Sequence, residues 1–149
     1  MTIFPTMKKL AVSKEFEVRF SEVDSMNVVW HGAYPLYLED AREKFGAEYG
    51  LEYLTIFNNG YFAPLVDMQI KYHKPLRYGS HPRIDIFYVP VEAAKIIFDY
   101  EIHDTTDDSL VATARTIQVF MDRDYQLVWD NPPFYQQWKE RMGVIDELQ

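Results

Sequence analysis

The sequence predicts an α+β domain in which five antiparallel strands pack against one long helix, with a short helix at the carboxyl end. Three observations lead to this prediction. Residues 33–49 repeat apolar side chains at the three- and four-residue spacings of a helix. Four later segments alternate apolar and polar residues with the period of strands. The connections between those segments are short, as in antiparallel hairpins.

The composition fits one folded domain over residues 1–149. A chain of 149 residues can build one sizeable core, and 48% hydrophobic residues argue against disorder. The formal net charge of −8 argues against general nucleic-acid binding, because phosphate backbones attract basic surfaces. The absence of cysteine excludes disulfide scaffolds, thiolate catalysis and cysteine zinc sites.

The amino-terminal sequence MTIFPTMKKL lacks the long apolar run and the small-residue cleavage site of a signal peptide. No stretch approaches the roughly 18 consecutive apolar residues of a membrane span. We therefore expect a cytoplasmic protein with no membrane partner.

The first elements are a strand and the long helix. Residues 15–21 alternate strictly and predict a half-buried strand, and a loop over 22–32 follows. The helix then runs from about Ala33 to Tyr49, and Gly50 can end it in a left-handed conformation.

The rest of the chain predicts the sheet and the last helix. The strands occupy residues 66–72, 84–88, 96–102 and 111–121. Small Ala112 and Ala114 on the last strand would let the helix lie close. Asn131 can cap the final helix, Pro132 and Pro133 suit its first turn, Gly143 can end it, and Phe134, Trp138 and Met142 form its packing stripe. An open five-stranded sheet leaves two bare edges, which favours edge-to-edge dimerisation.

The loop 22–32 is the candidate for chemistry. It leads into the amino terminus of the long helix, where backbone N–H groups and a partial positive charge can bind a carboxylate, a phosphate or a developing oxyanion. Asp24 lies a few residues upstream, and a carboxylate beside an oxyanion site is the minimum for acyl transfer or ester hydrolysis. Spacing alone favours the alternative that Asp24 caps a turn.

Residues 20–42, FSEVDSMNVVWHGAYPLYLEDAR, closely resemble the opening motif of the 4-hydroxybenzoyl-CoA thioesterase family. That motif has an Asp, a short apolar turn, a His, Tyr or Asn, and then Tyr-x-x-Tyr-x-Glu-x-Ala-Arg. The matching positions here are Asp24, His31, Tyr34, Tyr37, Glu39, Ala41 and Arg42. The later stretch 72–79, YHKPLRYG, looks like the turn between two strands of that family.

The resemblance implies a hotdog fold, an antiparallel sheet wrapped around the long helix, and hydrolysis of an acyl-CoA without a cofactor. It also implies dimers with active sites at their interface, and we expect two dimers to form a homotetramer. Asp24 would be the nucleophile or the general base for water. The backbone N–H of His31, or of a neighbour, would polarise the thioester carbonyl. The family usually has Gly where this chain has Asn27, and Asn tolerates left-handed backbone angles.

Further residues are candidates for substrate binding. Trp30 and the helix start at Gly32, Ala33 and Tyr34 would surround the acyl group and the carbonyl. Tyr61, Phe62, Pro64 and Val66 would line an acyl groove. Lys74 and Arg77, in a basic region with Lys71 and Arg83, would hold the coenzyme A phosphates, although the same residues suit a solvated hairpin.

Other interpretations stay open. The substrate could be an acyl-carrier-protein thioester, or the chain could bind an acyl ligand without catalysis. Glu39 and Arg42, three apart on the helix, are expected to form a structural pair. The four histidines, His31, His73, His81 and His103, lack the spacing of metal ligands, so we expect no metal.

Overall fold

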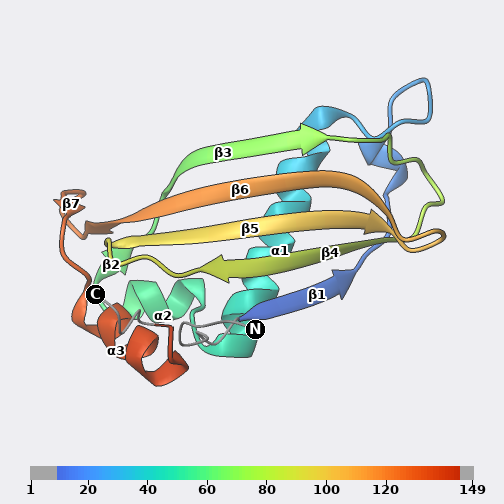
Figure 1. Cartoon of the computed structure of the whole chain (residues 1–149). Coiled ribbons are helices and arrows are strands. Elements are labelled where there is room, and N and C mark those ends of the chain that lie inside the picture. Colours follow the sequence, from blue (N-terminus) through green and yellow to red (C-terminus); the bar gives the residue numbers. More distant parts are fainter. Residues whose placement is uncertain (1–9, 145–149) are drawn as a thin grey trace.

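The computed structural model describes residues 10–144, which form an antiparallel sheet with one long helix across one face (Figure 1). Five strands make up most of the sheet. They are β1 (Ala11–Glu15), β3 (Leu65–Tyr72), β4 (Pro82–Val89), β5 (Lys95–Asp104) and β6 (Ser109–Asp122). Their spatial order is β1–β4–β5–β6, with β3 along the other side of β6. Two short strands, β2 (Tyr61–Phe62) and β7 (Leu127–Val128), pair with the end of β6.

The long helix α1 (Tyr34–Tyr49) matches its prediction to within one residue. Its apolar stripe faces the sheet and is buried, and Phe45, in its carboxyl-terminal half, is completely inaccessible. Gly50 follows with φ of 76°, a left-handed angle that glycine adopts without strain, and its N–H bonds the carbonyl of Gly46. On the sheet side, Ala112 of β6 is buried in the core. The predicted layer arrangement is therefore correct.

The core lies between α1 and the sheet and extends to the carboxy-terminal helix α3 (Pro133–Met142). The inward residues of β4 and β5 alternate with outward ones as the sequence indicated, and they are buried. Trp138 of α3 is buried in the core, while Phe134 and Met142 pack against it only partly. One short helix, α2 (Tyr53–Asn58), was not predicted.

The first strand was predicted too far along the chain. The strand β1 ends at Glu15, where its ladder with β4 ends, and the other residues of the predicted strand, 16–21, lie outside it. Val18 is buried, but Phe20 is 76% exposed and begins the short 3-10 helix Phe20–Glu22. Phe16 is partly buried and its N–H still donates to the carbonyl of Pro82 at 3.0 Å, so the alternation continues the burial pattern of β1 only as far as Val18. The sheet has seven strands where the sequence predicted five. The two additional strands, β2 and β7, have two residues each, which is too short for an alternating pattern to be recognised.

Asn131 does not cap α3, because Pro132 occupies the cap position. The Asn131 side chain instead donates to the carbonyl of Glu92 and accepts from Nζ of Lys139. Residues 1–9, where the sequence indicated no signal peptide, lie outside the described residues. Among the helices of residues 10–144, none combines the length and apolar composition that crossing a bilayer requires.

Candidate active site

The segment before α1 folds into a closed loop around Asp24. Val23 and Val29 form a bridge, and the N–H of Trp30 donates to the carbonyl of Glu22 at 3.1 Å. Oδ1 of Asp24 accepts hydrogen bonds from the N–H of Met26 at 2.8 Å and of Val28 at 3.2 Å. The loop is thus organised by a carboxylate that caps its own turn.

Asn27 adopts φ of 60°, which is the left-handed angle expected where the resembling family has Gly. Its N–H donates to the carbonyl of Asp24 at 3.0 Å, so the turn closes with Asn in this position. Asp24 itself is exposed, and its Oδ2 accepts no hydrogen bond from the described residues. The capping role therefore occupies one carboxylate oxygen and leaves the other for chemistry.

The helix start presents backbone donors beside this loop. Residues His31–Ala33 form a 3-10 turn that leads into α1, with Pro35 in the first turn of the helix. The N–H of Ala33 donates to the carbonyl of Trp30, whereas the N–H groups of His31 and Gly32 have no acceptor within residues 10–144. Two amides at a helix start can hold a negatively charged oxygen.

A pocket of about 360 Å³ opens between this helix start and the end of β3. Pockets of this size are typical for small ligands. It is lined by Val28, Val29, His31, Tyr34, Tyr72, His73, Lys74 and Pro75. The rings of Tyr34 and Tyr72 meet edge to face with centroids 4.9 Å apart, and the Tyr72 hydroxyl donates to the carbonyl of His31 at 3.5 Å. Burial, together with the neighbouring Tyr72, raises the pKa of Tyr34 to about 12, so Tyr34 remains neutral.

The pocket contains only some of the predicted substrate-binding residues. His31, Tyr34 and Lys74 line it, and Asp24 lies one hydrogen bond away through the N–H of Val28. Ala33 is buried, so it offers its backbone only. Trp30 is half exposed and rests edge-on against His31, outside the lining.

Five lining residues were missed by the sequence interpretation. Tyr72, His73 and Pro75 lie in the second matched stretch, of which the sequence analysis assigned only Lys74 and Arg77 to the substrate. Val28 and Val29 are apolar residues in a predicted loop, where polar residues are more usual. This departure could have indicated that they line a pocket. The backbone bridge between Val28 and Arg77 joins the two segments and builds the pocket.

The predicted acyl groove does not reach this pocket within one chain. Tyr61, Phe62, Pro64 and Val66 lie at the start of β3, whereas the pocket lies at its end. At the usual rise of a strand, β3 separates Leu65 from Tyr72 by about 23 Å. Val66 is 56% exposed on this edge strand.

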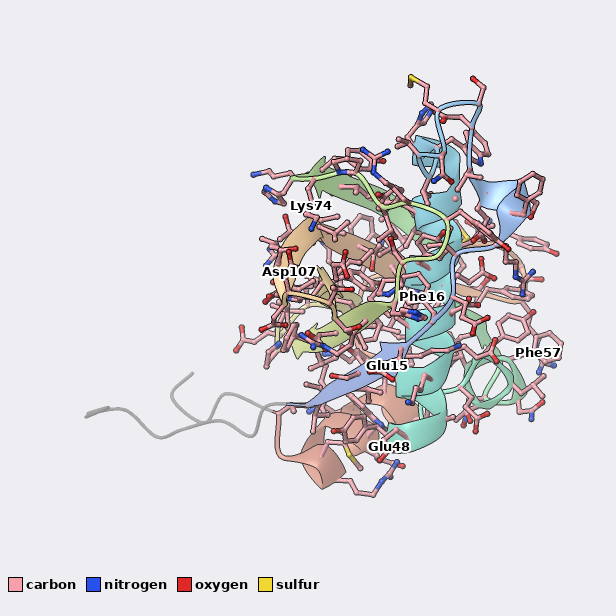
Figure 2. All side chains as sticks on the ribbon, turned by 90° about the vertical axis from the view of Figure 1, so that its right-hand side faces the viewer. Glu15, Phe16, Glu48, Phe57, Lys74 and Asp107 are labelled. Atoms are coloured by element: carbon pink, nitrogen blue, oxygen red, sulfur yellow. The ribbon has the colours of Figure 1, made fainter. Side chains whose placement is uncertain are left out.

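Much of the predicted basic region is engaged by carboxylates. Nζ of Lys74 donates to Oγ of Ser109 at 2.6 Å and lies 3.8 Å from Asp104 and 3.7 Å from Asp107. Figure 2 shows Lys74 and Asp107 on the same flank of the molecule.

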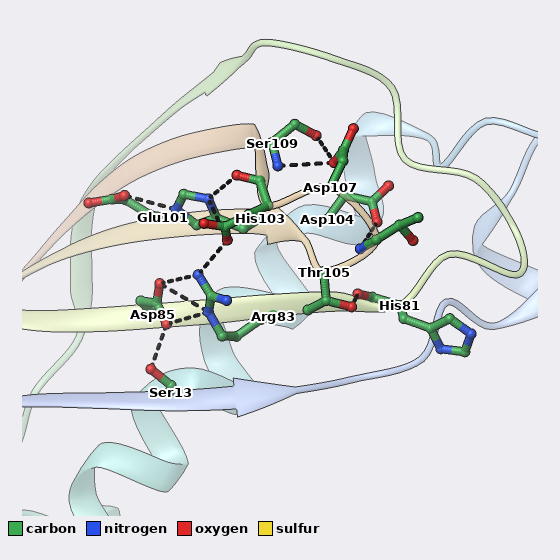
Figure 3. A network of polar contacts seen from close by, with 12 residues as sticks. Ser13, His81, Arg83, Asp85, Glu101, His103, Asp104, Thr105, Asp107 and Ser109 are labelled. Atoms are coloured by element: carbon green, nitrogen blue, oxygen red, sulfur yellow. Dashed lines mark hydrogen bonds and ion pairs between the residues drawn. The ribbon is translucent and has the colours of Figure 1, made fainter.

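Arg83 is likewise paired, with Asp85 and Asp108, in the network that Figure 3 shows. These carboxylate partners raise the pKa of Arg83 further above its usual value. Within the described residues Arg77 and Lys71 form no ion pair, so their charges remain open to a ligand.

The expected pair between Glu39 and Arg42 is not formed in residues 10–144. Nη1 of Arg42 donates instead to the hydroxyl of Tyr100, which is bonded to Thr116 in the core. His31 and His73 line the same pocket, but the described part of the chain has no group of three or more side chains arranged to hold a metal ion.

Comparisons with known proteins identify the family of this chain. The family model of the thioesterase-like superfamily matches residues 18–139. A putative acyl-CoA thioesterase, YneP of Bacillus subtilis (strain 168), is 32% identical over 107 residues, which cover 71% of this chain and 78% of that protein. The chloroplastic acyl-acyl carrier protein thioesterase ATL3 of Arabidopsis thaliana is 26% identical over 76% of this chain, which spans 60% of ATL3.

Solved structures establish the fold. The DHNA-CoA thioesterase from Staphylococcus aureus superposes with a TM-score of 0.78 at 23% identity, covering 87% of each chain. The 12:0-ACP thioesterase from Umbellularia californica gives a TM-score of 0.80 at 12% identity, covering 92% of this chain and 55% of that one. The hotdog fold that the sequence resemblance implied is confirmed.

Proposed function

Because this chain belongs to the thioesterase-like superfamily and is a thioester hydrolase, we propose that it hydrolyses an acyl-CoA to the free acid and coenzyme A. The observation that carries the proposal is the arrangement at the start of α1. The unpartnered amide of His31 belongs to a residue that lines the pocket, and the unpartnered amide of Gly32 follows it in the chain. Oδ1 of Asp24 accepts the N–H of Val28, which also lines the pocket.

The chemistry follows from these positions. The thioester carbonyl oxygen points to the amides of His31 and Gly32, which stabilise the negative charge that develops on it. Oδ2 of Asp24 either attacks the carbonyl carbon or removes a proton from the attacking water. The carbon–sulfur bond breaks, and the coenzyme A thiolate leaves and takes up a proton. If Asp24 is the nucleophile, the acyl group stays on its carboxylate as an anhydride, and water then hydrolyses that anhydride to release the free acid. His31 therefore acts through its backbone.

Coenzyme A extends from the pocket mouth across the basic loop after β3. Arg77 is exposed and suits the phosphates, since a guanidinium contacts two phosphate oxygens at once. Lys74 lines the pocket mouth and contributes when it exchanges its contacts with Ser109 and the two aspartates for a phosphate.

The working unit we propose is a homodimer joined along β3, two of which form the expected homotetramer. The strand β3 pairs with β6 on one side, and among the described residues its other edge pairs with no strand. Antiparallel pairing with a second copy about a two-fold axis places the Leu65 end of one strand beside the Tyr72 end of the other. Tyr61, Phe62, Pro64 and Val66 then reach the pocket of the second copy.

The proposed function is tested with a panel of acyl-CoA substrates and a free-thiol readout. We expect thiol release by the wild type, and a loss of about 10²–10⁴-fold in Asp24→Asn if the carboxylate is the base or nucleophile. The Asn variant keeps an oxygen that can cap the turn, so the fold is retained. Unchanged turnover in Asp24→Asn contradicts the mechanism, and tight binding of acyl-CoA without thiol release contradicts the activity.

The shared site is tested by mixing two variants. Asp24→Asn and Phe62→Ala chains are refolded together, so that heterodimers form. If each site takes Asp24 from one chain and Phe62 from the other, each heterodimer has one site in which both residues are wild type. About a quarter of all sites in an equimolar mixture are then intact, and activity returns in that proportion. If both residues act in the same chain, no activity returns. Light scattering on the wild type gives the oligomeric state.

A carrier-protein thioester is the second candidate, and the similarity to the Arabidopsis carrier-protein thioesterase supports it. An acidic carrier requires a basic docking surface, for which Lys71 and Arg77 are available. Rates on matched acyl-CoA and acyl-carrier substrates distinguish the two, and a faster reaction of the carrier thioester favours the second.

A further inference from the structure

The Asp24 loop is tied to α1 by a hydrogen bond between Glu22 and Tyr37. The Tyr37 hydroxyl donates to Oε1 of Glu22 at 2.9 Å. The same carboxylate oxygen accepts the N–H of Arg19 at 2.8 Å. The backbone carbonyl of Glu22 accepts the N–H of Trp30, which closes the loop that holds Asp24. One residue therefore fixes the entry to the loop, its closure and its contact with the helix.

Tyr37 connects this point to the pocket. It lies on the buried face of α1, one turn after Tyr34, and its ring packs against Tyr34 with centroids 5.7 Å apart. The ring of Phe16 packs against the ring of Tyr37, with centroids 4.5 Å apart. Burial and the hydrogen bond to Glu22 raise the pKa of Tyr37 well above its usual value, so the hydroxyl remains a donor.

The other attachments of the loop lead elsewhere. The N–H of Val29 donates to the carbonyl of Leu76, and Val28 bridges to Arg77, so these bonds join the loop to the segment after β3. Within residues 10–144, the bond from Tyr37 to Glu22 is the side-chain hydrogen bond that joins residues 22–30 to α1. The Asp24 carboxylate belongs to the loop, whereas the amides of His31 and Gly32 belong to the helix start.

We propose that Glu22 and Tyr37 are positioning residues that set the Asp24 carboxylate against the amides at the start of α1. The inference rests on the proposed thioester hydrolysis. Neither side chain lines the pocket, so their bond affects the rate of turnover and leaves substrate affinity unchanged. Misplacing a reacting group by a fraction of an ångström lowers the rate without unfolding the protein.

The experiment compares two tyrosines of the same helix. Tyr37→Phe removes one hydroxyl and keeps the ring in the core. We expect kcat to fall about 10- to 100-fold while KM stays within about twofold of the wild type. Tyr49→Phe is the matched control, because it removes a hydroxyl that donates to the carbonyl of Ala11 at 3.0 Å near the other end of α1. We expect Tyr49→Phe to keep the wild-type kcat.

Substitutions at Glu22 test the partner. Glu22→Gln keeps a side-chain oxygen that can accept from Tyr37, so we expect it to keep most of the activity. Glu22→Ala also removes the acceptor of the Arg19 N–H, so kcat should fall at least as far as in Tyr37→Phe. Adding Tyr37→Phe to Glu22→Ala should lower kcat no further, because the bond between the two side chains is already absent.

Each outcome decides the inference. Wild-type kcat in Tyr37→Phe, equal losses in Tyr37→Phe and Tyr49→Phe, or an effect confined to KM overturns the positioning role while leaving the hydrolase intact. A wild-type protein that releases no thiol from any acyl-CoA or acyl-carrier substrate overturns the proposed function, and this inference with it.

Discussion

The two ends of α1 lie in opposite environments. At its start, backbone amides have no acceptor in the described chain, Trp30 is half exposed, and an open pocket adjoins the helix. At its end, Gly50 closes the helix, and Nε1 of Trp138 donates to the carbonyl of Tyr49 at 2.7 Å. Groups left unsatisfied at the start are available to a ligand, whereas the equivalent groups at the end are used by the fold.

The same difference appears in the packing. Phe45, three turns into the helix, contacts the rings of Tyr88, Phe98 and Trp138 and is fully buried. Tyr34 at the start contacts Tyr72, which is half exposed on an edge strand. We infer that stability comes mainly from the carboxyl end of α1 and chemistry from its amino end. Substitutions at each end should therefore affect different measurements.

The largest effect is expected for Phe45→Ala. It removes a ring from the most enclosed part of the core and leaves a cavity, which costs about 3–5 kcal/mol of unfolding free energy. Urea unfolding measures the loss. The rate of hydrolysis per folded molecule should change little, since the aromatic rings that surround Phe45 lie outside the pocket. If Phe45→Ala keeps the wild-type stability and lowers turnover, the inference that the carboxyl end of α1 provides stability and the amino end chemistry is wrong.

A smaller loss of stability is expected for Lys139→Met. The buried Nζ of Lys139 donates to the carbonyls of Val91 and Ala93 and to Oδ1 of Asn131. Methionine leaves these acceptors without a donor, at a cost of about 2 kcal/mol. Asn131→Ala removes one of the three acceptors of Lys139 and its own hydrogen bond to the carbonyl of Glu92, and it leaves the ammonium in place. An unchanged urea midpoint in Lys139→Met would show that water replaces the ammonium.

The pH dependence of this loss follows from the pKa of Lys139. Burial lowers that pKa to about 8 from its ordinary value of 10.5. Between these values the unfolded chain binds more protons than the folded protein, so the unfolding free energy of the wild type rises with pH in that window. Lys139→Met lacks this contribution. The difference between the two proteins should therefore widen from pH 8 towards about pH 10, and urea unfolding at both values measures it.

The sequence predicted the helix and strands of the core better than it predicted the pocket at the amino end of α1. The helix period and Gly50 define α1, and alternation defines β4 and β5, because buried faces leave a regular pattern in one segment. The pocket is different, since Val28 meets Arg77 from a segment almost fifty residues later. Nothing within either segment specifies that contact.

Asp24 shows the same limit at one residue. Spacing favoured a turn cap and the family resemblance a catalytic group. The structure shows the cap at Oδ1 and leaves Oδ2 open, so the two interpretations are compatible. Asn131 was assigned as a helix cap because the sequence does not reveal that Lys139 lies beside it. Long-range polar contacts of this kind have no periodic signature.

The smallest effect is expected at the pocket end, for Gly32→Ala. A Cβ at Gly32 would overlap the ring of Trp30, which must then move away. The ring is half exposed and free to shift, so the urea midpoint should stay close to the wild type. The new methyl group crowds the amide of Gly32, and kcat/KM should fall about fivefold, less than the 10²–10³-fold that follows loss of an oxyanion donor.

The double variant Trp30→Ala/Gly32→Ala separates the two causes. If displacement of the ring produces the loss, adding Gly32→Ala to Trp30→Ala has no further effect, because the ring is already absent. If crowding of the amide produces it, the loss persists in the double variant. A fall in stability without a fall in kcat/KM would mean that this end of α1 supports the fold, and the contrast between the two ends would not hold.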